Sequence, residues 1–293
     1  MTDDPFVTHR SLLFTVAYEM LGSAADAEDV VQETWLRWAA RVDDLGLGAV
    51  RDERSYLVRI TTRLSLNRIR TMSRRRESYV GPWLPEPLLT SPDVAEDVEL
   101  ADSVSTAMLL VLETLTPTER AVFVLREVFD LPYDEIAAAV DKSPAAVRQV
   151  AHRARSHVES RRPRELVTDG ERSKVVERFL VAAATGDLQA LMDVLAPDVV
   201  LITDGGGQKQ AALKPIQGAE KVLRFLAGIR EKVGDSGAIP LTINGEIGLG
   251  LLLDGEVEAV ATMRIDGDRV TGLYLVRNPD KLGRIAEEVA LSR

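Results

Sequence analysis

The sequence predicts a multidomain chain: two all-α helical domains, the second with a helix-turn-helix, and then a C-terminal α+β domain. Three observations predict this order. Apolar residues recur at helical spacing through residues 6–76 and again through 101–162. A segment at 79–100 places four prolines between these two blocks. From residue 172, helical patterns precede short β-like runs with Asp-Gly turns, which is typical of an α+β domain.

The first helical block contains three predicted helices. Gly22 ends the first helix, whose apolar stripe consists of Leu12, Leu13, Val16, Ala17 and Met20. Ser23 is the predicted N-cap of the second helix, whose inner face carries Ala27, Val30, Val31, Thr34 and Trp38. The third helix spans 54–76, with its core side at Leu57, Ile60 and Leu64.

The second helical block ends in a pattern typical of a helix-turn-helix. A helix is predicted from about Thr118 to Phe129, followed by a short helix over Tyr133–Val140 and a tight turn. Ser143 caps the last helix, and Pro144 is its first residue. That helix is expected to bury Val147, Val150, Ala151 and Ala154, and to expose Arg148, Gln149, His152, Arg153 and Arg155. Arginine and glutamine form paired hydrogen bonds to purine edges, so this face suits the major groove. The alternative is a basic amphipathic helix packed on its own domain.

The C-terminal block is predicted to contain helices near 175–183 and 188–195, followed by antiparallel strands. The expected strands are 199–203, 241–244, 248–253, 257–263 and 270–276. The dipeptides Asp254-Gly255 and Asp266-Gly267 favour hairpin turns between them.

Charge is distributed unevenly along the chain. The net charge of −10 argues against indiscriminate binding of nucleic acids, yet residues 51–76 carry +7 and residues 142–164 carry +6. Two basic segments in an otherwise acidic chain favour two separate contacts with one polyanion. The alternative is that both segments are solvated helix faces. On the helix 54–76, arginines fall on one side together with aromatic, hydroxyl and amide groups, which suits a single-stranded nucleic acid. These residues are Ser55, Tyr56, Arg59, Thr62, Arg63, Asn67, Arg70 and Arg74.

Asp26, Asp29 and Glu33 are spaced three and four residues apart and therefore share one helix face. No histidine lies near them in the sequence, so this face is predicted to bind a protein rather than a metal. Zero cysteines exclude disulfides and thiolate metal sites, and the chain has only three scattered histidines. No cofactor or metal is expected. Without a signal peptide or a long apolar run, the expected location is the cytoplasm.

The stretch DAEDVVQETWLRW, the arginine-bearing helix, the linker and the helix-turn-helix together resemble an extracytoplasmic-function sigma factor of bacterial RNA polymerase. The resemblance covers roughly residues 6–160 and implies a region 2 domain at 1–77, a linker at 78–103 and a region 4 domain at 104–163. It implies binding to the core polymerase (the β′ clamp helices and the β flap) and to promoter DNA by a chain that is monomeric when free. A separate anti-sigma partner is compatible with it but not required.

The resemblance also assigns roles to residues. Polymerase binding would fall on Asp26, Asp29, Gln32 and Glu33. Recognition of the −10 element would fall on Arg51, Ser55, Tyr56, Arg59, Thr62, Arg63, Asn67 and Arg70. Recognition of the −35 element would fall on Ser143, Ala145, Arg148, Gln149, His152, Arg153 and Arg155.

Three further motifs resemble the subgroup of these factors that carries a fused C-terminal SnoaL-like domain, a cone-shaped α+β fold, here at 170–293. They are a linker motif, a glycine-rich loop and a motif near the C-terminus, and they imply an interdomain regulatory contact. Their residues are Trp83, Leu84, Pro85, Glu86, Pro87, Asp204, Gly205, Gly206, Gly207, Lys209, Asn278, Pro279, Asp280, Lys281 and Leu282. Gln208 stands before Lys209 and departs from the subgroup's loop pattern.

SnoaL-like folds include polyketide cyclases and isomerases, so a catalytic or small-molecule-sensing C-terminal domain is the alternative to regulation. Residues 170–293 contain neither histidine nor cysteine. A buried carboxylate of raised pKa could act as a base, and Asp204 or Glu258 are the candidates. The sequence favours regulation over catalysis.

Overall fold

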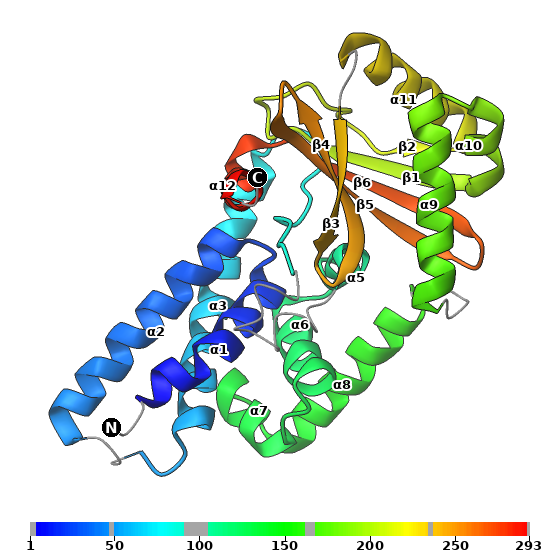
Figure 1. Ribbon diagram of the computed structural model, residues 1–293. Helices are drawn as coiled ribbons and strands as arrows, with labels where there is room; N and C mark the ends of the chain where they lie inside the picture. Colours follow the sequence, from blue (N-terminus) through cyan, green and yellow to red (C-terminus); the bar gives the residue numbers. More distant parts are fainter. Residues whose placement is uncertain (1–3, 47–49, 91–104, 162–167, 234–236, 292–293) are drawn as a thin grey trace. The chain divides into compact units, whose positions relative to one another are not determined.

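The chain forms two compact units in the computed structural model, which describes residues 4–46, 50–90, 105–161, 168–233 and 237–291 (Figure 1). The helical unit comprises Met1–Glu77, Val94–Val104 and Met108–Arg162. The sheet unit comprises Ser78–Asp93, Ser105–Ala107 and Pro163–Arg293. The predicted linker is therefore divided: its first part belongs to the sheet unit, and residues 91–103 lie outside the described residues.

The first half of the helical unit contains α1 (Pro5–Leu21), α2 (Ala24–Leu45) and α3 (Glu53–Glu77), as predicted. Gly22 ends α1 in the left-handed region with φ of 67°, and the Ser23 hydroxyl accepts a hydrogen bond from the Asp26 amide to cap α2. The inner face of α2 is buried. Its polar member, Thr34, forms a 3.1 Å hydrogen bond with Thr61 of α3, so the two helices are joined through a satisfied buried pair.

The second half contains α5 (Thr106–Leu112), α6 (Pro117–Phe123), α7 (Tyr133–Val140) and α8 (Pro144–Glu159). The helix expected to run to Phe129 changes at Val124 into a π-helical turn, η2 (Val124–Val128), of which Val124 and Leu125 are buried. Asp141 adopts φ of 56° and reverses the chain, after which the Ser143 hydroxyl caps α8. The predicted helix-turn-helix is confirmed.

The sheet unit consists of four helices and one mixed sheet among its described residues. Its helices are α9 (Asp169–Thr185), α10 (Leu188–Val194), α11 (Ala219–Val233) and α12 (Gly283–Leu291), with a 3-10 turn η3 (Pro279–Lys281) before α12. Its strands are β1 (Leu195–Asp204), β2 (Ile216–Gln217), β3 (Gly237–Ile243), β4 (Glu246–Leu253), β5 (Glu256–Asp266) and β6 (Arg269–Val276).

The strand order is β2-β1-β6-β5-β4-β3, and β3–β6 form the predicted antiparallel series. The expectation of a purely antiparallel sheet is wrong at one pair, because β1 and β6 are parallel. Parallel neighbours need a long connection, and here α11 and the four intervening strands β2, β3, β4 and β5 supply it. The expected order, all-α helical blocks of which the second carries a helix-turn-helix, followed by an α+β domain, is confirmed.

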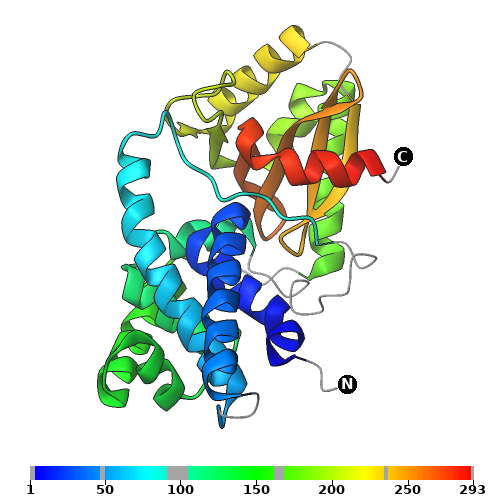
Figure 2. The ribbon, with the colours of Figure 1, turned by 90° about the vertical axis from the view of Figure 1, so that its left-hand side faces the viewer.

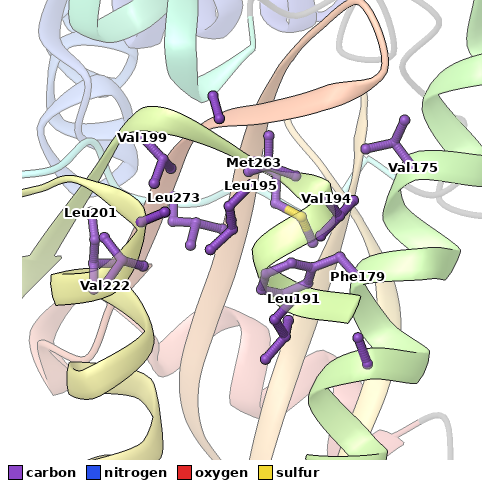
Figure 3. Packing of buried hydrophobic residues seen from close by; sticks show 14 of the residues in the cluster. Val175, Phe179, Leu191, Val194, Leu195, Val199, Leu201, Val222, Met263 and Leu273 are labelled. Atoms are coloured by element: carbon purple, nitrogen blue, oxygen red, sulfur yellow. The ribbon is translucent and has the colours of Figure 1, made fainter. Parts of the chain in front are cut away.

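Helices α9, α10 and α11 cover one face of the sheet, and apolar side chains fill the space between them (Figure 3). Phe179, Leu191 and Val194 from the helices lie against Met263 and Leu273 from the strands. Helix α12 packs on the sheet from the other side, against β5 (Figure 2). The interior of the cone is thus occupied by its own side chains.

Candidate functional site

The outer face of α8 carries the predicted base-contacting residues. Arg148, Gln149, His152 and Arg153 line a shallow open hollow of about 410 Å³. These four side chains and that of Arg155 are exposed, whereas all four predicted core residues of this helix are buried. Ser143 and Ala145 at the start of the helix are exposed as well. The amphipathic division that the sequence predicts is confirmed.

The three arginines of this face have different partners. Arg155 forms two hydrogen bonds with Glu127, of 2.6 and 3.2 Å, and Arg153 lies 3.7 Å from Glu119. Arg148 has no ion pair among the described residues. Its guanidinium lies over the ring of Tyr133, 5.5 Å from the centroid, which leaves the guanidinium N–H groups available.

The predicted −10 face of α3 lies against α7. The Ser55 hydroxyl is 2.7 Å from Glu135 Oε2, and Arg63 donates to the carbonyl oxygens of Ala138 at 3.0 Å and Ala139 at 3.4 Å. Thr62, on the same side of α3, is completely buried. The predicted contact of Thr62 with the −10 element stays a prediction.

The other predicted −10 residues remain accessible. Arg51, Asn67 and Arg70 are exposed, and the guanidinium of Arg59 lies 5.2 Å from the centre of the Tyr56 ring. Tyr56 is in turn adjacent to Trp38 of α2. Within the predicted set, Ser55 and Arg63 hydrogen-bond to α7, Thr62 is buried, and the other members are exposed or half-buried.

A second connection between the two halves of the helical unit was not predicted. Glu113 accepts hydrogen bonds from Arg76 of α3 and from Arg120 of α6. Arg76 Nη2 also donates to the carbonyl oxygen of Leu21 at 3.2 Å, and Arg120 Nε donates to that of Glu19 at 2.9 Å. Sequence spacing gives no signal for such a cluster, since its members come from three separate helices or their ends.

The predicted protein-binding face on α2 is partly neutralised within the chain. Arg68 of α3 pairs with both Asp26 and Asp29. Gln32 and Glu33 are exposed, and Trp35 and Leu36 beside them are exposed apolar side chains. The face thus combines acidic groups with an apolar patch, a composition suited to a protein partner.

In the sheet unit, the carboxylate of Asp204 holds the extended segment 78–90. Asp204 is completely buried at the end of β1. Its Oδ1 accepts from the Tyr79 hydroxyl at 2.6 Å and the Gly206 amide at 3.0 Å, and its Oδ2 accepts from the Leu84 amide at 2.9 Å. Lys281 Nζ pairs with the same Oδ2 at 2.7 Å. We name this arrangement the Asp204 clasp.

Two further residues complete the clasp. Lys281 also donates to the Leu84 carbonyl oxygen at 2.6 Å, and its Nζ lies 4.2 Å from the centre of the Trp83 ring. Asn278 Nδ2 donates to the Tyr79 hydroxyl at 2.9 Å. Burial and the adjacent Asp204 carboxylate raise the pKa of Tyr79 far above its usual value, so the phenol remains a proton donor.

The segment then continues along the free edge of β3. The backbone amide of Asn244 donates to the Leu88 carbonyl oxygen at 2.9 Å, and the Leu88 amide donates to Asn244 Oδ1 at 3.2 Å. The Thr90 amide donates to the Thr242 carbonyl oxygen at 2.9 Å. Leu89 pairs with Ile243 as an isolated antiparallel bridge. The edge strand β3 is therefore covered by the chain's own segment (Figure 2).

The glycine-rich loop permits the close approach that its sequence predicts. Gly206 adopts φ of 60°, and a Cβ atom there would lie 2.4 Å from the Asn278 side chain. A Cβ on Gly205 would lie 2.2 Å from the Lys209 carbonyl oxygen. Gln208 hydrogen-bonds to Asp280 at 2.7 Å, so the residue that departs from the subgroup pattern joins the loop to η3.

The residues of the linker motif differ in burial. Trp83 is half-buried, whereas Leu84 is completely buried and Pro85, Glu86 and Pro87 are buried beside it. Tyr79 and Asn244 were missed. The dipeptide Asn244-Gly245 could have predicted the β3–β4 hairpin, because Asn-Gly favours a type I′ turn. Both residues have the positive φ that this turn requires, 52° and 72°.

The two carboxylates considered as candidate bases have structural partners. Asp204 forms the clasp, and Glu258 pairs with Lys209 at 3.0 Å and Arg277 at 2.8 Å. Partial burial raises the pKa of Glu258, but these two cations outweigh it and hold the pKa below its usual value. Glu258 therefore lacks the raised pKa that a base requires. Within the described ranges, no helix is long and apolar enough to cross a membrane.

Comparisons with known proteins agree with this geometry. Residues 6–75 match Sigma-70 region 2, and residues 105–158 match Sigma-70, region 4. The ECF RNA polymerase sigma factor SigJ of Mycobacterium tuberculosis is 36% identical over 291 residues, which cover 94% of this chain and 91% of SigJ. The probable ECF RNA polymerase sigma factor SigI of the same species is 38% identical over 194 residues, 65% of this chain and 66% of SigI. The crystal structure of Mycobacterium tuberculosis SigJ superposes with a TM-score of 0.78 at 33% identity, covering 95% of this chain and 97% of that one.

The clasp leads to a prediction about stability. Asp204→Ala leaves the Lys281 ammonium and three other donors without their acceptor, so we expect it to destabilise the sheet unit by about 3–5 kcal/mol. Hydrogen–deuterium exchange of the full chain should show lost protection at 79–90. The matched control is Asp198→Ala, which removes an exposed carboxylate from the same strand. Equal protection of 79–90 in both variants would contradict the role of the clasp.

Proposed function

This chain belongs to the extracytoplasmic-function (ECF) sigma factors of RNA polymerase. We propose which of its surfaces bind the −35 element, the −10 element and the core polymerase during promoter-specific initiation. As a sigma factor it acts with the core polymerase and promoter DNA. The observation that carries the proposal is the exposed face of α8, where Arg148 is oriented by Tyr133. We assign region 2 to 1–77, region 4 to 104–163 and a SnoaL-like regulatory domain to 170–293, with 78–103 between the two regions.

For the −35 element, we assign base recognition to Arg148, Gln149 and His152. An arginine stacked on an aromatic ring keeps its N–H edge free and loses less conformational entropy when it binds a guanine edge. Arg153 and Arg155 are held by Glu119 and Glu127, so their cations are suited to phosphate contacts. Ser143 and Ala145, at the N-terminal end of α8, lie where a recognition helix approaches the groove.

For the −10 element, we assign Arg51, Tyr56, Arg59, Asn67 and Arg70 as the accessible part of the surface. Ser55 and Arg63 hydrogen-bond to α7 and Thr62 is buried, so we propose that these three contact DNA fully only when α3 separates from α7. The contact therefore lowers the fraction of free chain that can bind DNA through α3. We name the state in which α3 packs on α7 the closed helical unit.

For the polymerase, we assign the face of α2 around Asp26, Asp29, Gln32 and Glu33 to the β′ clamp helices. The exposed Trp35 and Leu36 beside these residues supply the apolar area that such a contact needs. We assign region 4 to the β flap and regard the free chain as a monomer.

We further propose that the sheet unit controls initiation without requiring a separate anti-sigma protein. The Asp204 clasp holds Tyr79, which follows the end of α3 by two residues, so the path of the chain between regions 2 and 4 depends on the sheet unit. Tethering within one chain keeps the effective concentration of such a contact high. We propose no catalytic role for the sheet unit, since apolar side chains occupy its cone and Glu258 is ion-paired.

A first prediction concerns Arg148 and Tyr133. Arg148→Ala should reduce discrimination between −35 sequences by about 1–3 kcal/mol, and Tyr133→Leu by about 0.5–1 kcal/mol, because the arginine remains but loses its orientation. Competition binding of the polymerase holoenzyme to −35 variants measures both. Tyr133→Phe keeps the ring and should restore the preference. Arg155→Ala is the control, and should weaken binding to all sequences alike.

A second prediction concerns the closed helical unit. Glu135→Ala removes the acceptor that α7 offers to the Ser55 hydroxyl, which keeps Asp52 as its partner at the start of α3. No assigned DNA-binding residue is altered, and binding of the free chain to single-stranded −10 DNA should increase by about two- to tenfold. Asp134→Ala removes an equal charge from an exposed position on the same helix and should leave binding nearly unchanged. Fluorescence anisotropy with labelled DNA measures the difference. Equal affinities of the two variants would refute the inhibitory role of this contact.

A third prediction tests the function itself. With core polymerase, the full chain should initiate transcription from a promoter that the core alone does not use. Asp204→Ala should change this activity strongly, and Asp198→Ala should not, since only the former releases residues 79–90. Run-off transcription together with a binding assay for core polymerase separates a loss of promoter recognition from a loss of docking. Unchanged activity in Asp204→Ala would contradict the proposed control of initiation by the sheet unit.

A further inference from the structure

The turn between β3 and β4 contains a chemically labile dipeptide, Asn244-Gly245. Asparagine is labile because the backbone nitrogen of the next residue can attack the side-chain carboxamide. Glycine lacks the Cβ atom that hinders this attack, so an asparagine before a glycine is especially reactive. Of the three asparagines in the chain, at 67, 244 and 278, only Asn244 precedes a glycine.

The reaction needs no reagent other than water. The Gly245 nitrogen forms a bond to Cγ of Asn244, and the bond between Cγ and Nδ2 breaks. The leaving ammonia carries away the proton of the Gly245 N–H. Water then opens the five-membered imide at one of its two carbonyl carbons, which leaves aspartate or isoaspartate at position 244. Atoms and charges therefore balance without an oxidant or a reductant.

The extended segment 78–90 holds both reacting groups of this turn. The Gly245 N–H donates to Thr90 Oγ1 at 2.8 Å. The carboxamide oxygen of Asn244 accepts from the Leu88 amide at 3.2 Å. Ring closure removes the Gly245 proton and moves the carboxamide onto the nitrogen, so it breaks both of these bonds to the segment.

Burial restrains the carboxamide further. Asn244 is only 1% exposed and Thr90 only 6%, although Gly245 itself is exposed. The carboxamide is thus kept from the water that accepts the proton and opens the imide. We propose that Asn244 is a deamidation site, which stays intact while residues 88–90 cover the edge of β3 and reacts when they leave it.

Deamidation to isoaspartate makes the release of the segment permanent. Isoaspartate passes the main chain through its own Cβ atom, and an inserted backbone atom disturbs the fixed geometry of a two-residue turn. The acceptor for the Leu88 amide is then displaced. This consequence rests on the proposed function: the Asp204 clasp and the edge of β3 hold the same segment, so a deamidated chain keeps the altered promoter activity of an opened one.

The test measures deamidation in the full chain by peptide mass spectrometry, which detects the mass gained when the amide becomes a carboxyl. At mildly alkaline pH, the folded chain should modify Asn244 at least about tenfold more slowly than the same chain unfolded in urea, because the reaction requires local opening. Asn278 is the internal reference, since Pro279 has no N–H with which to attack it.

Two pairs of variants alter the contacts of the segment and leave the dipeptide intact. Asp204→Ala is expected to release residues 79–90 and should deamidate at least about fivefold faster than Asp198→Ala. Thr90→Val keeps the shape of the side chain but removes the acceptor of the Gly245 N–H, and should react about threefold faster than the unaltered chain. Thr90→Ser keeps the hydroxyl and should react as slowly as the unaltered chain. Circular dichroism reports whether the variants fold, and the Thr90 pair decides if Asp204→Ala does not.

Several outcomes would overturn the proposal. A folded chain that deamidates as fast as the chain in urea, or faster, refutes protection by the segment, as do equal rates within either pair of folded variants. If a chain enriched in isoaspartate by incubation keeps the run-off activity of fresh protein, the permanence of release is wrong. If the chain supports no promoter-dependent transcription while the deamidation rates follow the expected order, the proposed function fails and the site stands.

Discussion

The buried carboxylate of Asp204 is the constraint on which the sheet unit depends. A charge removed from water is tolerated only when donors surround it, and these donors come from residues 79, 84, 206 and 281. Burial of one side chain thus requires the extended segment, the glycine-rich loop and η3 to be in place together. Residues 78–90, which follow α3, are for this reason part of the sheet unit.

In the helical unit, polar and charged side chains of the proposed binding surfaces also form bonds within the chain. Arg63 and Ser55 bond to α7, and Arg68 neutralises two carboxylates of the α2 face. Under the proposed assignments, each such contact is exchanged when DNA or polymerase binds, so the free energy of recognition is reduced by that of the internal contact. In α8 the internal partners also give the arginines different binding properties. Arg148 is stacked on a ring and keeps its N–H groups available, whereas the N–H groups of Arg153 and Arg155 are partly used in ion pairs.

The composition of the glycine-rich loop after Asp204 follows from its contacts with neighbouring segments. Three glycines follow Asp204 since a side chain at Gly205 or Gly206 would collide with Lys209 or Asn278. Asn278 in turn bonds to Tyr79, which connects the loop to the segment after α3. Gln208 extends the loop without breaking this arrangement, because its side chain reaches Asp280.

The sequence by itself determined the three-part architecture, the helix-turn-helix and the exposed face of α8, because periodicity and capping act between residues close in the chain. It also indicated the glycine-rich loop as a place of close approach. Only the tertiary structure decided that Leu84 rather than Trp83 is the buried anchor, that Thr62 is covered, and that β1 lies parallel to β6. The same holds for the Glu113 cluster and for Tyr79 at Asp204. These features join residues that are tens to hundreds of positions apart, and no local pattern records which distant donor will satisfy a buried charge.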